Sequence, residues 1–178
     1  MKILLDACVL FPTVLREILL GVAAKGLFEP LWSPRILEEW ARATIKLGPG
    51  AEDVARGEIA LLSANWPKAS VQPREKDLAR LHLPDENDVH VLAAAIAGHA
   101  DLIVTFNAKD FPRHTLTEEG LSRQDPDQVL RALFAENPDA VREVINSVHE
   151  KAQTLSGETL PLRPLLKRAR LPRLAKLL

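Results

Sequence analysis

Acidic side chains at the ends of two apolar runs are the feature of this sequence with the clearest chemical potential. Asp6 follows the apolar run 2–5, and Asp110 lies in the loop that follows the run 102–105. Short apolar runs rich in β-branched residues are typical of buried strands. Because ligands of open α/β sheets lie outside the carboxyl ends of the strands, we expect Asp6 and Asp110 at that edge.

Three further acids are expected to join them. Asp85 and Asp88 precede the alanine-rich segment 89–97, which predicts a helix that runs antiparallel to the following strand. The start of this helix therefore lies near the carboxyl end of that strand. Glu39 follows the helix start Ser33-Pro34, where a serine N-cap precedes a proline at the first helical position. Taken alone, the aspartate pair would also serve as an N-cap and a first-turn acid.

Four or five clustered carboxylates repel one another and need protons or cations to neutralise them. An all-oxygen set that requires no Cys or His suits Mg²⁺ or Mn²⁺ better than Zn²⁺. Such metals activate a water and stabilise charge on a phosphoryl group, so the pattern predicts metal-dependent phosphodiester hydrolysis. A phosphatase of the haloacid-dehalogenase type would need Asp-x-Asp after the first strand, and Cys8 stands in the second position.

Charge is distributed unevenly along the 178 residues. Residues 1–158 hold 17 of the cations and all 24 acids, a net charge of −7, whereas residues 159–178 hold six cations and no acid. An acidic body repels phosphate unless a cation lies between them, and bound metal ions would supply that cation. The absence of tyrosine and the small number of Trp and Phe argue against a base-stacking platform.

The expected architecture is α/β: a three-layer α/β/α sandwich with a central, mostly parallel sheet, because strands alternate with helices. Strands are predicted at 2–5, 27–31, 69–72, 102–105 and 120–124, and helices at 12–25, 33–47, 51–65, 75–81, 89–97, 127–136 and 139–152. We divide the chain into a nuclease-like domain (1–125), C-terminal helices (126–158) and a basic tail rich in Leu and Pro (159–178). The leucines of this tail are expected to dock on the body or on a second subunit, and contact between the tail's cations and RNA is the alternative.

A cytoplasmic protein is expected from three further observations. The lone Cys8 cannot form an internal disulfide, and the first residues do not resemble a signal peptide. No run of 18 apolar residues is present, so no membrane association is expected.

Four segments, in this order, resemble those of the PIN-domain ribonucleases, specifically the VapC-like toxins of bacterial toxin–antitoxin pairs. They are Leu4–Leu10, Leu37–Trp40, Leu83–Asp88 with Leu92–Ala95, and Val104–Phe111, and the resemblance covers roughly residues 1–125. It implies a Mg²⁺- or Mn²⁺-dependent ribonuclease, a hydrolase that binds RNA, is inhibited by an antitoxin protein and forms a homodimer. A catalytically silent RNA- or partner-binding module on the same fold is the alternative.

By this resemblance, an acidic quartet holds one or two metal ions, with Asp85 nearby and Asn107 as the polar residue of the final motif. The quartet is Asp6, Glu39, Asp88 and Asp110. Glu39 is preferred to Glu38 because it precedes the bulky Trp40, and the choice between Asp85 and Asp88 as the main ligand stays open.

Three neighbours of these acids carry expectations of their own. The first motif departs from the usual Asp-Thr-Asn or Asp-Ser-Asn, because Ala7 and Cys8 offer neither the hydroxyl nor the amide that orients the carboxylate. Cys8 is therefore interpreted as a small buried hydrophobe. His90 is expected to point away from the site, because a helix turns by about 200° over the two residues from Asp88.

Overall fold

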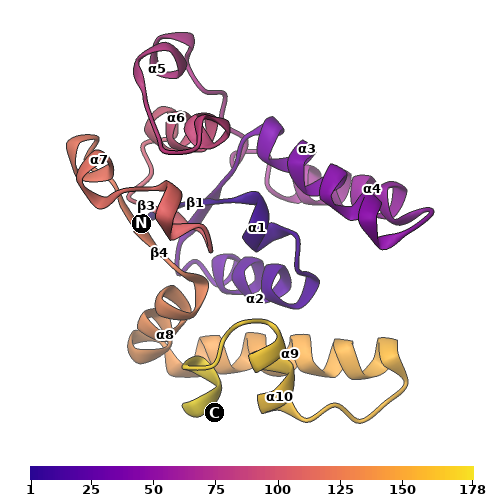
Figure 1. The fold of residues 1–178 in the computed structure, drawn as a ribbon. Helices are drawn as coiled ribbons and strands as arrows, with labels where there is room; N and C mark the ends of the chain where they lie inside the picture. Colours follow the sequence, from indigo (N-terminus) through magenta and orange to yellow (C-terminus); the bar gives the residue numbers. More distant parts are fainter.

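A four-stranded parallel sheet forms the centre of the structure, a computed structural model that describes residues 1–178 (Figure 1). The strand order is β2-β1-β3-β4. The strands are β1 Lys2–Leu5, β2 Glu29–Leu31, β3 Leu102–Val104 and β4 Ser122–Gln124. Leu4 lies between Leu31 and Ile103 in the register of the sheet. The central strands β1 and β3 are almost wholly apolar and buried, as strands covered on both faces must be.

Helices cover both faces of this sheet, with α6 on one side and α2 on the other, and α9 packs against α2 (Figure 1). The α-helices are α1 Ala7–Leu10, α2 Thr13–Ala24, α3 Pro34–Ala43, α4 Ala51–Asn65, α5 Glu75–Arg80, α6 Val89–Ala97, α7 Arg113–Glu118, α8 Pro126–Glu136, α9 Pro138–Ser156 and α10 Leu162–Arg168. Four 3₁₀ turns complete the chain: η1 Thr44–Leu47, η2 Glu86–Asp88, η3 Ala108–Asp110 and η4 Leu174–Lys176. The predicted three-layer α/β/α sandwich is confirmed. None of these helices is both long and apolar enough to cross a membrane.

Local sequence signals explain where the helices begin. Ser33 Oγ accepts a hydrogen bond from the Ile36 amide at 3.2 Å, as expected of an N-cap before Pro34. At α8, the Asp125 carboxylate accepts from the Gln128 amide at 2.8 Å, and the Gln128 side chain accepts from the Asp125 amide at 3.0 Å. This reciprocal capping box fixes the direction in which the C-terminal helices leave the sheet.

One local prediction is wrong. Residues 69–72 form no strand; Ser70 makes only an isolated bridge with Trp32, because a short, Pro-flanked segment does not extend the sheet edge. The segment 7–10, for which no element was predicted, is a short helix that begins directly after β1, where the Asp6 side chain accepts from the Ala7 amide at 2.7 Å. A further short helix, α7, also follows the loop at 106–112 and was not predicted.

The C-terminal tail docks on the body, as expected. Leu165, Leu166, Leu171 and Leu174 are buried, and the last three belong to the same continuous hydrophobic core as the sheet. Asp127, buried at the start of α8, accepts hydrogen bonds from two tail amides, Arg173 at 2.8 Å and Leu174 at 2.9 Å. A buried carboxylate thus fixes the last turn of the chain.

We predict that Asp127→Ala lowers the free energy of unfolding by about 2 to 3 kcal/mol more than Asp139→Ala does, because it leaves two tail amides without their charged acceptor. Asp139 is the matched control: it is exposed and, like Asp127, follows a proline at the start of a helix, so both variants lose the same interaction with the helix dipole. Urea denaturation measures both values, and an equal loss would contradict this role of Asp127.

Candidate metal centre

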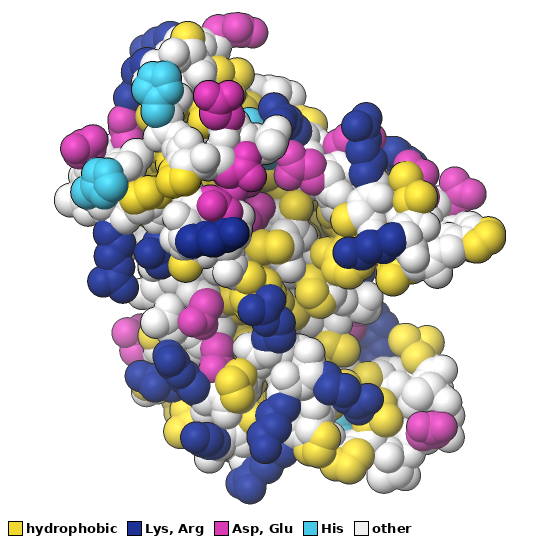
Figure 2. Space-filling view, in the orientation of Figure 1, with side chains coloured by type: hydrophobic (Ala, Val, Ile, Leu, Met, Phe, Trp, Pro, Cys, Tyr) yellow, Lys and Arg dark blue, Asp and Glu magenta, His cyan; other side chains and the backbone are white.

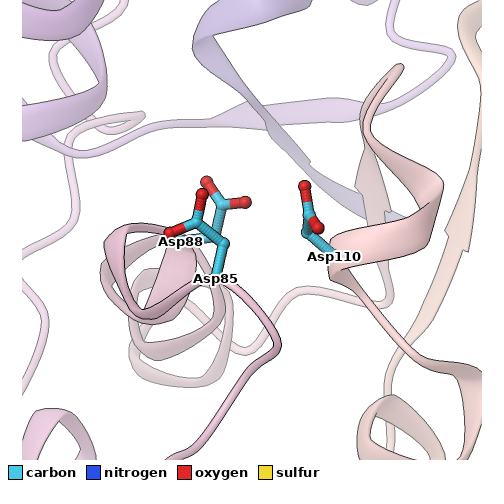
Figure 3. A group of neighbouring side chains, drawn as sticks. All are labelled: Asp85, Asp88 and Asp110. Carbon is cyan, nitrogen blue, oxygen red and sulfur yellow. The ribbon is translucent and has the colours of Figure 1, made fainter.

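Three aspartates converge at the carboxyl edge of the sheet (Figure 3). Asp85 is the N-cap of the turn η2 and Asp88 is its last residue, whereas Asp110 ends η3 on the opposite side; one carboxylate oxygen of each lies within 4.8 Å of the others. The side chain of Asp85 is fixed locally, because its Oδ1 accepts from the Asn87 amide at 2.9 Å. The helix-start interpretation of Asp85 is therefore correct, and it coexists with the cluster.

Asp88 also belongs to a second group of acids. A small pocket of about 390 Å³ is lined by Asp6, Glu39 and Asp88, together with Ala7, Cys8, Phe106 and Asn107. Asn107 Nδ2 donates to Asp88 Oδ2 at 3.1 Å and so holds that carboxylate between the two groups. The structure therefore brings together all six residues predicted for the site, with Asp88 at their centre.

Asp6 is oriented by a residue that the sequence analysis missed. Thr105, buried at the end of β3, donates its hydroxyl to Asp6 Oδ2 at 2.6 Å. The expectation that Asp6 lacks an orienting hydroxyl is wrong: Thr105 supplies it from the neighbouring strand instead of position 7. Because β1 and β3 pair in parallel, the residues that follow them lie side by side. A threonine directly after a buried strand next to Asp6 was the available signal.

Cys8 is a hydrogen-bonded residue of this pocket rather than a buried hydrophobe. It is partly exposed, its Sγ lies 3.2 Å from Asp6 Oδ2, and the Phe106 amide donates to Sγ at 3.3 Å. Burial, followed by the negative charge of Asp6, raises the pKa of the Cys8 thiol to about 12. The thiol therefore stays protonated at neutral pH and donates to the carboxylate, a contact that its place in α1, two residues after Asp6, allows.

The two adjacent glutamates of α3 face different surroundings. Glu38 forms ion pairs with Arg42 at 2.8 Å and Arg56 at 2.9 Å, which lower its pKa to about 2. Glu39 lines the acidic pocket. Geometry thus agrees with the preference for Glu39.

His90 does not point away from the site, contrary to expectation. It is buried, and its Nε2 lies 2.7 Å from Glu39 Oε1, although neither ring nitrogen has a hydrogen bond of good geometry. The rotation of an α-helix does not give the direction of His90 relative to Asp88, because Asp88 belongs to the 3₁₀ turn η2. In addition, the acid that His90 contacts comes from a different helix, α3. Contacts between separate helices cannot be derived from the rotation along one of them.

The electrostatics of the cluster are strongest at Asp88. Partial burial, and then the negative charges of Asp6, Asp85, Asp110 and Glu39, raise its pKa to about 6. This shift measures how unfavourable a further negative charge is at that point. An oxygen-only donor set under such repulsion fits a hard divalent cation.

The fold is a parallel α/β sheet, and its carboxylates gather beyond the ends of β1 and β3, as in a site for a divalent cation. Comparison of the sequence with known families identifies the family. The PIN domain family model matches residues 2–109, more than half of the chain, and the protein belongs to this family. Among solved structures, VapBC-1 from nontypeable Haemophilus influenzae is similar, with 17% identity over 71% of this chain and 98% of that chain and a TM-score of 0.47. No curated protein matches the sequence.

We predict that Asp88 makes the metal-free protein lose stability, relative to an Asp88→Asn variant, as the pH rises from about 4 to about 6. The pKa of Asp88 is raised in the folded protein, so at this residue the folded state binds more protons than the unfolded state in this window. Urea denaturation in EDTA across this range measures the effect. Asp88→Asn should flatten the dependence, whereas Asp139→Asn, at an exposed position, should not. The same pH dependence in wild type and Asp88→Asn would contradict the prediction.

Proposed function

We propose that this protein is a metal-dependent endoribonuclease that hydrolyses RNA phosphodiester bonds. The observation that carries the proposal is the convergence of Asp85, Asp88 and Asp110 within 4.8 Å, with Asp88 shared by the pocket that Asp6 and Glu39 line. Membership of the PIN domain family, whose members are generally nucleases, supports it.

The donor set fits Mg²⁺ or Mn²⁺. Asp85, Asp88 and Asp110 would hold one ion, and Asp6 and Glu39 lie on the other side of Asp88. When bound, such an ion activates water and stabilises the charge that develops on the phosphoryl group.

The surrounding residues hold these acids in position. The buried Thr105 holds one oxygen of Asp6 by a hydrogen bond, and Asn107 holds one oxygen of Asp88 in the same way. His90 packs against Glu39 from the interior side. Because these contacts hold the carboxylates close together before a cation binds, binding needs no rearrangement of the site. A bound cation would reduce the repulsion among the carboxylates.

As its biological setting, we propose the toxin of a toxin–antitoxin pair that acts in the cytoplasm as a homodimer and is inhibited by an antitoxin protein. The motif resemblance to VapC-like toxins supports this setting. So do four exposed apolar side chains on two adjacent elements, Ile45 and Leu47 of η1 and Val54 and Leu61 of α4. Protein partners cover apolar surface of this kind.

We predict that Asp6→Asn, Asp88→Asn and Glu39→Gln each reduce RNA cleavage roughly a hundredfold or more, because each removes ligand charge without changing side-chain volume. Glu38→Gln is the matched control, since this neighbour of Glu39 is paired with two arginines outside the pocket. Cleavage of a labelled RNA in Mn²⁺ and in EDTA measures the effect.

An Asp6→Asn Asp88→Asn double variant should be no worse than either single variant if both acids serve one site. Full cleavage by Asp6→Asn, or cleavage that survives EDTA, would refute the proposal. Wild-type protein that neither cleaves RNA nor binds Mn²⁺ would favour the silent RNA- or partner-binding module.

A further inference from the structure

A groove of opposite charge lies beside the acidic centre. Its volume is about 760 Å³, and its lining is mainly polar. The lining includes five cations, Arg113, Arg123, Lys167, Arg170 and Arg173, and two acids, Asp125 and Asp127. We call it the basic groove. Figure 2 shows the corresponding separation of charge, with Asp and Glu gathered between α6 and α3 and with Lys and Arg gathered below them, over α10 and the C-terminal end.

The cations of this groove are available to a ligand. None of the five forms an ion pair with an acidic side chain, and only Arg123 has a side-chain hydrogen bond, from Nε to the Phe111 carbonyl at 2.6 Å. The two acids face backbone amides, because Asp125 caps α8 and Asp127 accepts from two tail amides. With five cations against two acids, the groove carries a net positive charge.

The basic groove adjoins the acidic pocket. Phe106 lines both, and Thr105, which holds Asp6, lines the groove as well. The Arg170 guanidinium lies over the Phe106 ring, 3.7 Å from its centroid, and so stands at the boundary between the two. A chain lying in the groove would reach the acids by passing this arginine.

The C-terminal tail supplies three of these cations, and it lies outside the residues that the family model matches. After α10 the chain reverses through Arg170, which has a φ of +63°, and the Leu171 amide donates to the Leu166 carbonyl at 2.9 Å. Burial of Leu166 and Leu171 holds this reversal in place. Docking of the leucines is thus what points Lys167, Arg170 and Arg173 at the groove.

We propose that the basic groove binds the phosphodiester backbone of single-stranded RNA and holds it next to the acidic centre. The proposal rests on the proposed function, because its ligand is the same RNA. An acidic site repels phosphates that lie outside metal contact, so flanking phosphates need cations elsewhere. Phe106, Ala108 and Pro172 are the only apolar side chains among the lining residues, which favours a polyanion over the buried apolar anchors of a protein interface.

The test compares two triple variants of equal charge. The groove variant is Lys167→Gln Arg170→Gln Arg173→Gln, and the control is Arg163→Gln Arg168→Gln Lys176→Gln, which changes exposed tail cations outside the groove. Binding of a labelled single-stranded RNA of about 16 nucleotides is measured in EDTA against salt concentration. The groove variant should bind on the order of tenfold more weakly and show a salt slope reduced by about 2, since each phosphate contact contributes about 0.7. The control should match wild type.

A second variant leaves Arg170 and Arg173 unchanged, so the contact of Arg170 with Phe106 and the position of Arg173 at Asp127 are kept. Arg113→Gln Lys167→Gln removes one cation from α7 and one from α10, on two separate elements of the groove, and should reduce the slope by about 1.4. In Mn²⁺ cleavage assays, both groove variants should raise KM and leave kcat unchanged.

Equal salt slopes in the groove variants and the control would overturn the proposal. It would also be overturned if a labelled polyglutamate peptide bound wild-type protein as tightly as the RNA does and lost as much affinity in the groove variants. These outcomes are separate from failure of the proposed function. If wild-type protein cleaves no RNA but the variants show the predicted salt slopes, the basic groove is supported and the nuclease function is refuted. If the protein cleaves RNA and the groove variants show unchanged salt slopes, the nuclease function is supported and the role of the groove is refuted.

Discussion

Repulsion among carboxylates at the carboxyl edge of the sheet is the constraint on which the site depends. Asp88 stands among Asp6, Asp85, Asp110 and Glu39, and burial with these charges raises its pKa to about 6. Such a cluster persists only if rigid elements hold each acid against the repulsion of the others. Two buried strands, a helix and two 3₁₀ turns do so here, and the arrangement is one that a divalent cation stabilises.

Charge separation across the molecule follows from the same constraint. The acidic centre repels the polyanion that we propose it cleaves, and the basic groove lies at its border, where Phe106 lines both. The basic tail reaches this position only because its leucines join the core and Asp127 fixes its end. A tail that is remote in sequence thereby becomes part of the surface around the site.

Much of the site could be predicted because its acids are placed by local sequence. Asp6 and Asp110 follow apolar strands, and Asp85 starts a helical turn, so each position follows from a few neighbouring residues. Thr105 and His90 could not be assigned in this way. Thr105 meets an acid 99 residues away, and His90 meets a different helix; such contacts depend on strand register and helix packing. For the segment 69–72, local residues predicted a strand that does not form. Whether such a segment joins the sheet depends on pairing at the sheet edge, which its own residues do not determine.

The acids around Asp88 are proposed to form a metal centre. Anomalous diffraction from crystals soaked in Mn²⁺ tests this proposal most directly, because it locates the metal without reference to any activity. We expect an anomalous peak bounded by Asp85, Asp88 and Asp110, or between Asp88 and the pair Asp6 and Glu39, and its loss in Asp88→Asn crystals. Saturating Mn²⁺ with no peak within coordination distance of Asp88 would contradict it.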